Sequence, residues 1–436
     1  MTTKEICAVT KGQYTGPDLK TEGVTTDSRG DVNGKLFIPI IGDIFDGHDF
    51  IDLALEKGAI CSLSEKSGPS DKIIRVESTR KALQDLAAYS RNQFKGPVVA
   101  ITGSAGKTTT KDIIASVLSQ KFNTLKTQGN FNNDIGLPLT LLRREESQEA
   151  MVLEMGMNHM GEISVLSRIG KPTICLITNI GDAHIENFGS REGILKAKSE
   201  IFEGLQDGGT VILNGDDPLL VSLPKIPHAK TTIYCHMDSA KDIKHKGFHG
   251  ISCTISGVKV DIPLPGRHNV MNALMAFAVG LELGLKPEQI AKGISEFKPS
   301  GNRMAISEAK GMTIINDTYN ASPSSMKATL DMLKETEGRK VSILGDMFEL
   351  GDFAEDMHKD VGQYAAKNVD LLIAIGPLSK HMYEAHTKQG GQAVYYETKE
   401  AFAQEWQKHL KPGDAVLVKA SRGMALEYVV EKITEE

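Results

Sequence analysis

The stretch VVAITGSAGKTTTKDIIASVL, residues 98–118, begins with an apolar run, continues through a glycine-rich turn, and ends in a helical pattern. Gly103 and Gly106 allow the backbone N–H groups of this turn to point at an anion. The positive end of the following helix strengthens that attraction, while Lys107 adds a charge and Thr108 a hydroxyl for Mg²⁺. The order strand, loop, helix therefore predicts a phosphate-binding loop. The loop residues are Gly103, Ser104, Ala105, Gly106, Lys107, Thr108 and Thr109.

This loop is a variant of the general pattern G-x-x-x-x-G-K-[ST]. The pattern expects glycine at position 101, where the chain has Ile101. The alternative interpretation is a chance glycine turn between a strand and a helix. We favour the phosphate loop because the strand, the Gly-Lys-Thr sequence and the helix follow in the required order.

Length and composition limit the classes of protein to which the chain can belong. Its 436 residues exceed what one hydrophobic core accommodates, so two or three domains are expected. The net charge of -6 and the absence of a basic block argue against nucleic-acid binding. No apolar run is long enough to span a bilayer, and the N-terminus lacks the pattern of a secretory signal. Five scattered cysteines without a C-x-x-C spacing favour neither a disulfide framework nor a zinc site, and indicate a cytoplasmic protein.

The distribution of apolar runs predicts three α/β domains. Short strands and turns in residues 1–84 indicate a small N-terminal α/β domain. In residues 85–299, apolar strands alternate with helices, which is typical of a mostly parallel sheet with helices on both faces. A second series in residues 300–436 resembles a Rossmann-like, doubly wound domain. Ligands of such sheets bind at the carboxyl ends of the strands, so the residues that follow each strand are candidates for the site.

Two such positions carry side chains that bind metals. Glu154 ends an apolar run in AMVLEMGMNHMGE, and His184 follows the next one in TNIGDAHIENFG. A magnesium ion at the phosphate loop requires an oxygen-rich neighbour of this kind. The alternative for both residues is a plain surface position, and it is stronger for His184.

A lysine in GILKAKSEIF lies on the apolar face of the expected helix. Ile194, Leu195, Ile201 and Phe202 form a stripe at offsets 0, 1, 7 and 8, and Lys198 falls inside it at offset 4. Burial would lower the pKa of the amine and make it nucleophilic. The sequence pattern alone leaves an equal alternative, in which the stem covers the core and the ammonium reaches water.

Taken together, these segments resemble the Mur ligases, the ATP-dependent amide-forming enzymes of peptidoglycan precursor synthesis. The resemblance covers nearly the whole chain. It rests on TGSAGKTTT, GNFNNDIGLP, EMGMNHMGEI, TNIGDAHIENFGS, ILKAKSEIF, LNGDD, GRHNVMNALMA, NDTYNASPSSMKATL, LGDMFELG and VKASRGM.

The resemblance implies a set of cofactors and of residues that hold them. The cofactors are ATP, two Mg²⁺ ions and a carbamate formed from CO₂ on Lys198, which favours the buried position of that lysine. Lys107, Lys198 and His184 would be catalytic. The metal ligands would be Thr108, Glu154, His184 and the carbamylated Lys198.

Further residues are implied for the nucleotide and the other substrates. Besides the phosphate loop, ATP would contact Asn269, Asn272, Arg303 and Asp317. The other substrates would contact Ser28, Arg29, Asn132, Asn133, Asn320 and Ser322. The alternatives are helix capping or polar filling for the two asparagines of RHNVMNA, and a turn and a surface charge for Ser28 and Arg29.

The implied reaction joins D-alanyl-D-alanine to UDP-N-acetylmuramoyl-tripeptide through an acyl phosphate. A monomer that neither binds nucleic acid nor inserts into a membrane would suffice for it. Two departures from the family affect contacts in the C-terminal domain: Ser322 replaces an asparagine of YNANP, and Ala420 a glycine of KGSR. A serine followed by proline still favours a helix start at this point.

Two alternatives remain open from the sequence. One is another ligase of the same superfamily, either the enzyme adding the third peptide residue or a folylpolyglutamate synthetase. The DNPR stretch of the diaminopimelate-adding enzyme is absent. The other is an ATPase switch, although the sequence has no evident arginine-finger segment and no N-K-x-D.

Overall fold

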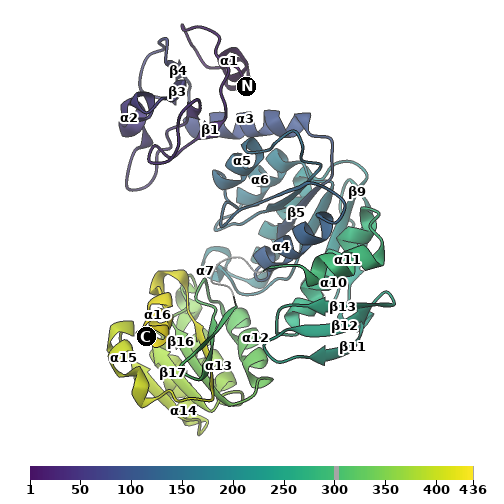
Figure 1. Cartoon of the computed structure of the whole chain (residues 1–436), viewed down its shortest axis with the longest axis vertical. Helices are drawn as coiled ribbons and strands as arrows, with labels where there is room; N and C mark the ends of the chain where they lie inside the picture. Colours follow the sequence, from purple (N-terminus) through teal and green to yellow (C-terminus); the bar gives the residue numbers. More distant parts are fainter. Residues whose placement is uncertain (299–303, 436) are drawn as a thin grey trace.

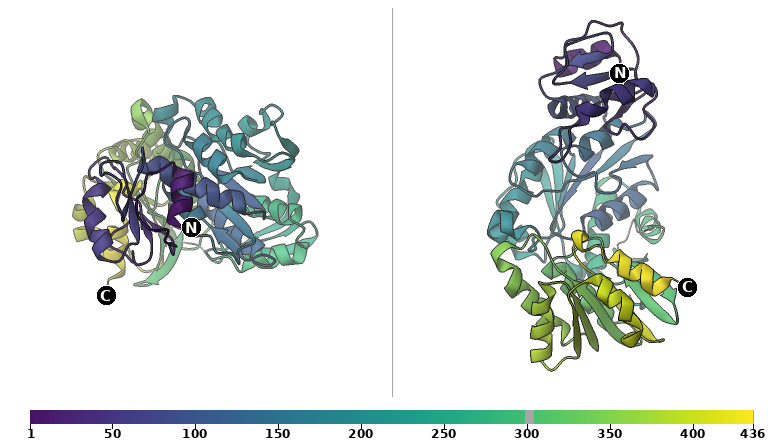
Figure 2. Two further views of the ribbon diagram at one scale, coloured as in Figure 1. Left: turned by 90° about the horizontal axis from the view of Figure 1, so that it is seen from above. Right: turned by 90° about the vertical axis from the view of Figure 1, so that its left-hand side faces the viewer.

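The computed structural model describes residues 1–298 and 304–435. The chain forms three α/β domains in sequence order, and the central domain lies between the other two (Figure 1). The right-hand view of Figure 2 also places the N-terminal and C-terminal domains at opposite ends of the molecule. The expected three-domain α/β architecture is confirmed, while the exact domain boundaries remain predictions.

The N-terminal domain is built on a four-stranded parallel sheet in the order β1-β2-β3-β4. Its first helix starts with a capping box, in which Thr2 and Glu5 satisfy each other's backbone N–H groups. The elements are α1 (Thr3–Thr10), β1 (Val24–Thr25), β2 (Leu36–Phe37), η1 (Gly47–Phe50), α2 (Ile51–Glu56), β3 (Cys61–Ser64), β4 (Ile73–Arg75) and α3 (Thr79–Gln93).

Helix α3 belongs to two domains at once, because it packs against α1 on one side and against α5 and α6 on the other. The boundary expected between residues 84 and 85 falls inside this helix. Near its end, buried Arg91 donates to the carbonyls of Phe94, Gly170 and Lys171. In addition, Leu139 of α5 is part of the apolar core of the N-terminal domain. The first two domains therefore share packing as well as a helix.

The central domain contains a six-stranded parallel sheet in the order β10-β9-β8-β5-β7-β6. Alternate residues of β5 enter two different cores: Val98 and Ala100 face one, Val99 and Ile101 the other. Helices cover both faces, as expected. The elements are β5 (Val98–Thr102), α4 (Lys107–Leu118), β6 (Thr124–Lys126), α5 (Gly136–Leu142), β7 (Ala150–Glu154), α6 (Glu162–Gly170), β8 (Ile174–Ile177), α7 (Ile185–Phe188), α8 (Arg191–Ser199), η2 (Glu200–Gly204), β9 (Gly209–Asn214), α9 (Pro218–Val221), β10 (Ala229–Cys235), η3 (Met237–Ser239), α10 (His268–Glu282) and α11 (Pro287–Ser295).

A small antiparallel sheet interrupts this α/β series, and the sequence analysis did not anticipate it. It consists of β11 (Ala240–His245), β12 (Ile251–Ile255) and β13 (Val258–Ile262). Ser256 and Gly257 connect β12 to β13, both with positive φ, as a two-residue hairpin turn requires. Its inner side chains pack against α10 and α11, within the core that covers one face of the large sheet.

The C-terminal domain has a second six-stranded sheet, in the order β14-β15-β19-β16-β17-β18. All its pairs are parallel except the one between β14 and β15, in agreement with the doubly wound domain that was expected. The elements are β14 (Ala305–Ala309), β15 (Met312–Asn316), α12 (Pro323–Lys334), β16 (Arg339–Gly345), η4 (Gly351–Phe353), α13 (Ala354–Ala365), β17 (Leu371–Ile375), α14 (Ser379–Lys388), β18 (Ala393–Tyr396), α15 (Lys399–Glu405), η5 (Trp406–Lys408), β19 (Asp414–Lys419), η6 (Arg422–Met424) and α16 (Glu427–Thr434).

In the part of the chain that the structure describes, no helix combines the length and the apolar character needed to cross a bilayer.

Candidate active site

The glycine-rich loop connects β5 to α4, as the sequence predicted. Gly103 has a φ of 151°, and a Cβ there would lie 1.9 Å from Oγ1 of Thr178. Gly106 has a φ of 79° and is the residue before the first turn of α4. Both positions therefore require glycine. Lys107 starts the helix, and its Nζ donates to the carbonyl of Gly103 at 2.7 Å.

The segment after β8 fixes the shape of this loop, a role that the sequence analysis missed. Asn179 accepts from the N–H of Ser104 with its carbonyl and from that of Ala105 with its side chain, at 3.0 and 2.9 Å. Thr178 donates to the carbonyl of Ala105 at 2.6 Å. Both residues directly follow a buried strand, so their position was the available signal. The loop is thus held in place by backbone and side-chain bonds from the neighbouring strand.

Lys198 is buried on α8, as the apolar stripe predicted. Only 2% of the residue is exposed, whereas Lys196 of the same helix is exposed to solvent. Burial, together with the positive charge of Lys107, holds the pKa of Lys198 well below its ordinary value. No carboxylate among the described residues forms an ion pair with it to offset this effect. The helical-face argument is confirmed, and the amine is electrostatically close to the phosphate loop.

Glu154 ends β7 beside β5 and is 1% exposed. Its backbone N–H donates to the Thr127 hydroxyl, and its Oε1 accepts from the side-chain amide of Asn132 at 2.9 Å. The second carboxylate oxygen is buried and has no hydrogen-bond partner. An unsatisfied buried carboxylate oxygen is costly unless another group binds it. Glu154 is therefore not the plain surface residue of the alternative interpretation.

His184 lies at the junction of two domains. It precedes α7 with a φ of 62°, and its Nδ1 is 2.6 Å from Oε2 of Glu349 in the C-terminal domain. The two atoms are within ion-pair distance, but their geometry lies outside that of a hydrogen bond. The contact lowers the pKa of Glu349. Sequence reasoning did not single out Glu349, because the contact depends on how the domains are placed.

Helix α10 lines the other side of the loop. A Cβ on Gly106 would lie 3.0 Å from Oδ1 of Asn272, and the Asn272 amide donates to Asn269 at 2.9 Å. Asn269 in turn donates to the carbonyl of Pro265. Neither asparagine caps the helix, since no side chain forms a cap bond at its start. Their expected contact with ATP remains a prediction.

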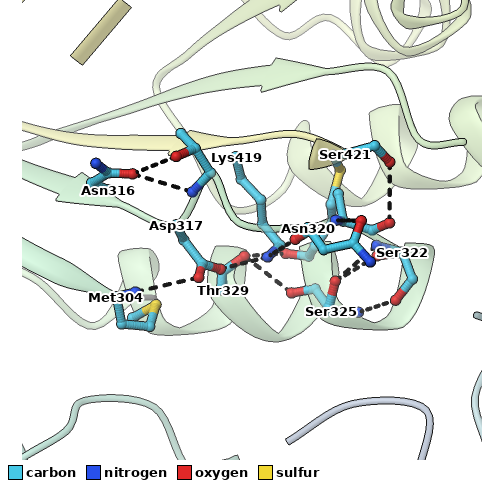
Figure 3. Close-up of polar contacts among 12 residues, drawn as sticks. Met304, Asn316, Asp317, Asn320, Ser322, Ser325, Thr329, Lys419 and Ser421 are labelled. Atoms are coloured by element: carbon cyan, nitrogen blue, oxygen red, sulfur yellow. Dashed lines mark hydrogen bonds and ion pairs between the residues drawn. The ribbon is translucent and has the colours of Figure 1, made fainter. Parts of the chain in front are cut away.

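The expected C-terminal residues cluster after β15 (Figure 3). Asp317 is buried and pairs with Lys419, which sequence reasoning did not select. Ser322 caps α12 in a reciprocal capping box with Ser325, which confirms the expected helix start. The side-chain oxygen of Asn320 accepts a hydrogen bond from the backbone N–H of Ala321. Arg303 lies outside the described residues.

The remaining predicted substrate residues lie nearer the N-terminal end. Ser28 is buried in the N-terminal domain, and the neighbouring Arg29 is exposed and pairs with Asp27 at 2.9 Å. Arg29 holds the pKa of Asp27 at about 2. Asn133 accepts from the backbone N–H of Gly136 at the start of α5, next to Asn132. Contact of these residues with the substrates stays a prediction.

The side chains near the loop fit magnesium only together with further ligands. Within residues 1–298 and 304–435, no three His, Cys, Asp or Glu side chains gather to hold a metal ion. Mg²⁺, however, commonly uses one or two carboxylates and completes its shell with phosphates and water. The unsatisfied oxygen of Glu154 and the buried Thr108 would provide such a partial set.

The fold and the loop define the class of protein: the chain belongs to the Mur ligase family. The family's models match residues 20–91 (Mur ligase family, catalytic domain), 101–280 (Mur ligase middle domain) and 302–422 (Mur ligase, glutamate ligase domain).

Within this family, individual relatives of one kind are similar to the chain over its whole length. The chain is 40% identical to the UDP-N-acetylmuramoyl-tripeptide--D-alanyl-D-alanine ligase of Bacillus subtilis and 36% identical to that of Escherichia coli. Each match covers 100% of this chain and 98% of the relative. Among solved structures, MurF from Acinetobacter baumannii superposes with a TM-score of 0.91 at 32% identity, covering 100% of this chain and 99% of that one. MurF ligase from Thermotoga maritima in complex with ADP gives 0.85 at 30% identity, covering 95% and 98%.

Proposed function

We propose that the chain is an ATP-dependent ligase of peptidoglycan precursor synthesis. It joins D-alanyl-D-alanine to UDP-N-acetylmuramoyl-tripeptide and gives UDP-N-acetylmuramoyl-pentapeptide, ADP and phosphate. The single observation that carries this function is the combination of three features of the central domain and its phosphate loop. These are the Lys107 loop, the buried low-pKa amine of Lys198 and the unsatisfied carboxylate oxygen of Glu154. Full-length similarity to ligases of this name supports the choice of substrates.

The chemistry explains why a ligase needs a phosphate loop. A carboxylate does not react with an amine in neutral water, because its leaving group is poor. Transfer of the γ-phosphoryl of ATP to the carboxylate gives an acyl phosphate, whose leaving group is phosphate. The amine of D-alanyl-D-alanine then attacks the carbonyl carbon, and the tetrahedral intermediate expels phosphate. Lys107 and the backbone N–H groups of the loop stabilise charge on the transferred phosphoryl.

Lys198 is suited to carry the carbamate that the family resemblance implies. An uncharged amine attacks CO₂, and burial next to Lys107 favours the uncharged form. The amine nitrogen bonds to the carbon of CO₂ and releases a proton to solvent, which leaves a carbamate anion with two oxygens of the kind that Mg²⁺ prefers. Two bound Mg²⁺ ions would neutralise charge on the phosphates. Thr108, Glu154, His184 and the carbamate would hold them.

The three domains suggest a division of the substrates. We place the UDP-sugar on the N-terminal domain near Ser28 and Arg29, with Asn132 and Asn133 on its path to the central domain. Asn269, Asn272, Asp317 and Arg303 would contact ATP, and Asn320 and Ser322 the dipeptide. Because the two outer domains lie at opposite ends, closure is needed to bring the reactants together (Figure 1). Closure would also exclude the water that hydrolyses an acyl phosphate.

We further propose a cytoplasmic monomer that binds neither nucleic acid nor membrane. All five cysteines are free thiols, four of them buried. Burial raises the pKa of Cys61 and Cys235 to about 12, so they are poor nucleophiles and poor metal ligands.

The test is ADP formation with UDP-tripeptides ending in diaminopimelate or in lysine, each with and without D-alanyl-D-alanine. We expect ADP release to require ATP, one UDP-tripeptide and the dipeptide together, with the pentapeptide product visible by mass spectrometry. ATP hydrolysis that ignores both substrates would instead support an ATPase switch.

A further inference from the structure

Two strands of the C-terminal sheet bring a buried acid and a buried base to one edge. In β15 and β19, which are parallel neighbours, Asn316 pairs with Val418. Asp317 follows the first strand, and its N–H donates to the carbonyl of Val418 at 3.0 Å. Lys419 is the last residue of the second strand. Their side chains are therefore placed together by the register of the sheet itself.

Lys419 contacts two points of the loop that follows β15. Its Nζ donates to Oδ2 of Asp317 at 2.5 Å and to the carbonyl of Asn320 at 2.9 Å (Figure 3). The lysine is 3% exposed and the aspartate 8%. Since both groups are nearly excluded from water, each depends on the other for compensation of its charge. One cation thus sets the distance between the start and the end of the loop.

Each of these points connects to a different part of the site. Oδ1 of Asp317 accepts from the N–H of Met304, the first described residue after the connection from the central domain. Asn320 leads directly to Ser322, which caps α12. Asp317 is thus on the side assigned to the nucleotide, and Asn320 on the side assigned to the dipeptide.

The pair also acts on the central domain. Burial lowers the pKa of His268, the carboxylate of Asp317 raises it, and the charge of Lys419 lowers it. His268 begins α10, the helix whose Asn272 lies against Gly106 of the phosphate loop. The acid and the base therefore face the helix that lines the nucleotide loop.

We propose that Lys419 is a positioning residue that couples the nucleotide side of the C-terminal domain to its dipeptide side, by holding Asp317 and the Asn320 carbonyl at a fixed spacing. This inference rests on the proposed function. It assigns to Lys419 a role in the affinity for two substrates, and not only in the neutralisation of a buried acid.

The experiment distinguishes a positioning role of Lys419 from simple neutralisation of Asp317. It uses Lys419→Met, Asp317→Asn and the double variant. KM for ATP and for D-alanyl-D-alanine is measured by ADP release at saturating UDP-tripeptide. A hydrogen bond to a charged group corresponds to about tenfold or more in affinity. We expect Lys419→Met alone to raise both KM values about tenfold.

The Asp317→Asn background provides the decisive comparison, because the buried acid is then already neutral. Adding Lys419→Met in that background should leave KM for ATP nearly unchanged but still raise KM for D-alanyl-D-alanine about tenfold, through the lost bond to Asn320. If the dipeptide KM does not rise there, Lys419 acts only on Asp317 and the proposal is wrong. The double variant contains no unpaired buried charge and can be compared directly with the wild type, so the dipeptide KM decides the question even if either single variant does not fold.

Lys327→Met is the matched control. Lys327 forms an ion pair with Asp360 in the same domain, but both side chains are partly exposed. Both of its KM values should equal those of the wild type. A wild-type enzyme that forms no pentapeptide would contradict the proposed function, whereas an active wild type with unchanged Lys419→Met KM values would contradict this inference alone.

Discussion

The central and C-terminal domains each bury a lysine near the candidate site, but they treat its charge differently. Lys419 is matched by Asp317 and a backbone carbonyl. Lys198 is subject to burial and to the like charge of Lys107, and both lower its pKa. A matched lysine remains a fixed cation that can only position its neighbours. A buried lysine without a matching carboxylate is an amine available for reaction, so the surroundings of each lysine decide its chemistry.

The largest effect is expected from Lys107, whose charge contributes to the low pKa of Lys198. Lys107→Ala should reduce the rate of ligation ~10²–10³-fold, the usual loss for one electrostatic stabiliser of a transition state. The fold should stay intact, because the side chain is only half-buried. Steady-state kinetics at saturating ATP measures the loss of rate, and circular dichroism checks that the fold is intact. Near-normal turnover would remove Lys107 from the mechanism.

Replacing Lys198 should have the next largest effect on activity. Lys198→Ala removes the amine that would carry the carbamate, so most activity should be lost. Formate or acetate could occupy the vacated space and restore part of the rate, since each supplies carboxylate oxygens. Bicarbonate should help only the wild type, after CO₂ has been stripped from the buffer. Rescue of the alanine variant by bicarbonate but not by formate would contradict a carbamate role.

The two lysines should respond in opposite directions when each is changed to methionine. Lys198→Met should raise the melting temperature measured without CO₂, because it removes the cost of burying an amine. The folded-state pKa of Lys198 is lowered, so this residue binds more protons in the unfolded chain and its contribution to stability increases with pH up to about 10.5. The gain from Lys198→Met should therefore shrink as the pH rises.

Lys419→Met should lower the melting temperature instead, by an amount equivalent to about 3–5 kcal/mol, since it leaves a buried carboxylate unpaired. Calorimetric scans of both variants at several pH values provide the comparison. Stabilisation by both changes, or by neither, would show that the two surroundings are not electrostatically different.

The smallest effect is expected from Lys196, which is exposed on the same helix as Lys198. Lys196→Ala should change stability by less than about 0.5 kcal/mol and leave activity almost unchanged. Urea unfolding and the standard assay measure both. An essential Lys196 beside a dispensable Lys198 would overturn the helical-face argument together with the family correspondence.

Local patterns in the sequence predicted those features that depend on a single helix, strand or loop. The buried side of α8 followed from four apolar residues around Lys198, and the phosphate loop from the order strand, glycines, lysine and helix. Glu154 could be selected because parallel strands end at a common edge. The hairpin turn at Ser256 and Gly257 carries a signal in the sequence as well, but the sequence analysis did not predict the β12–β13 pair.

Other features could not be predicted because they arise from packing between distant segments. The contact between His184 and Glu349 depends on the orientation of two domains. The pairing of Asp317 with Lys419 depends on the strand order of the C-terminal sheet, which places β19 next to β15 although 97 residues separate Asn316 from Asp414 in the chain. Neither of these two contacts produces a periodic pattern in the sequence.

The helix shared by the first two domains has a consequence for biosynthesis. The apolar core of the N-terminal domain includes Leu139, which lies well beyond the end of α3 at Gln93. During translation, that core cannot close until α5 has left the ribosome, although all strands of the N-terminal sheet are complete by Arg75. We therefore expect the nascent N-terminal domain to reach its full packing only after this part of its neighbour has been synthesised.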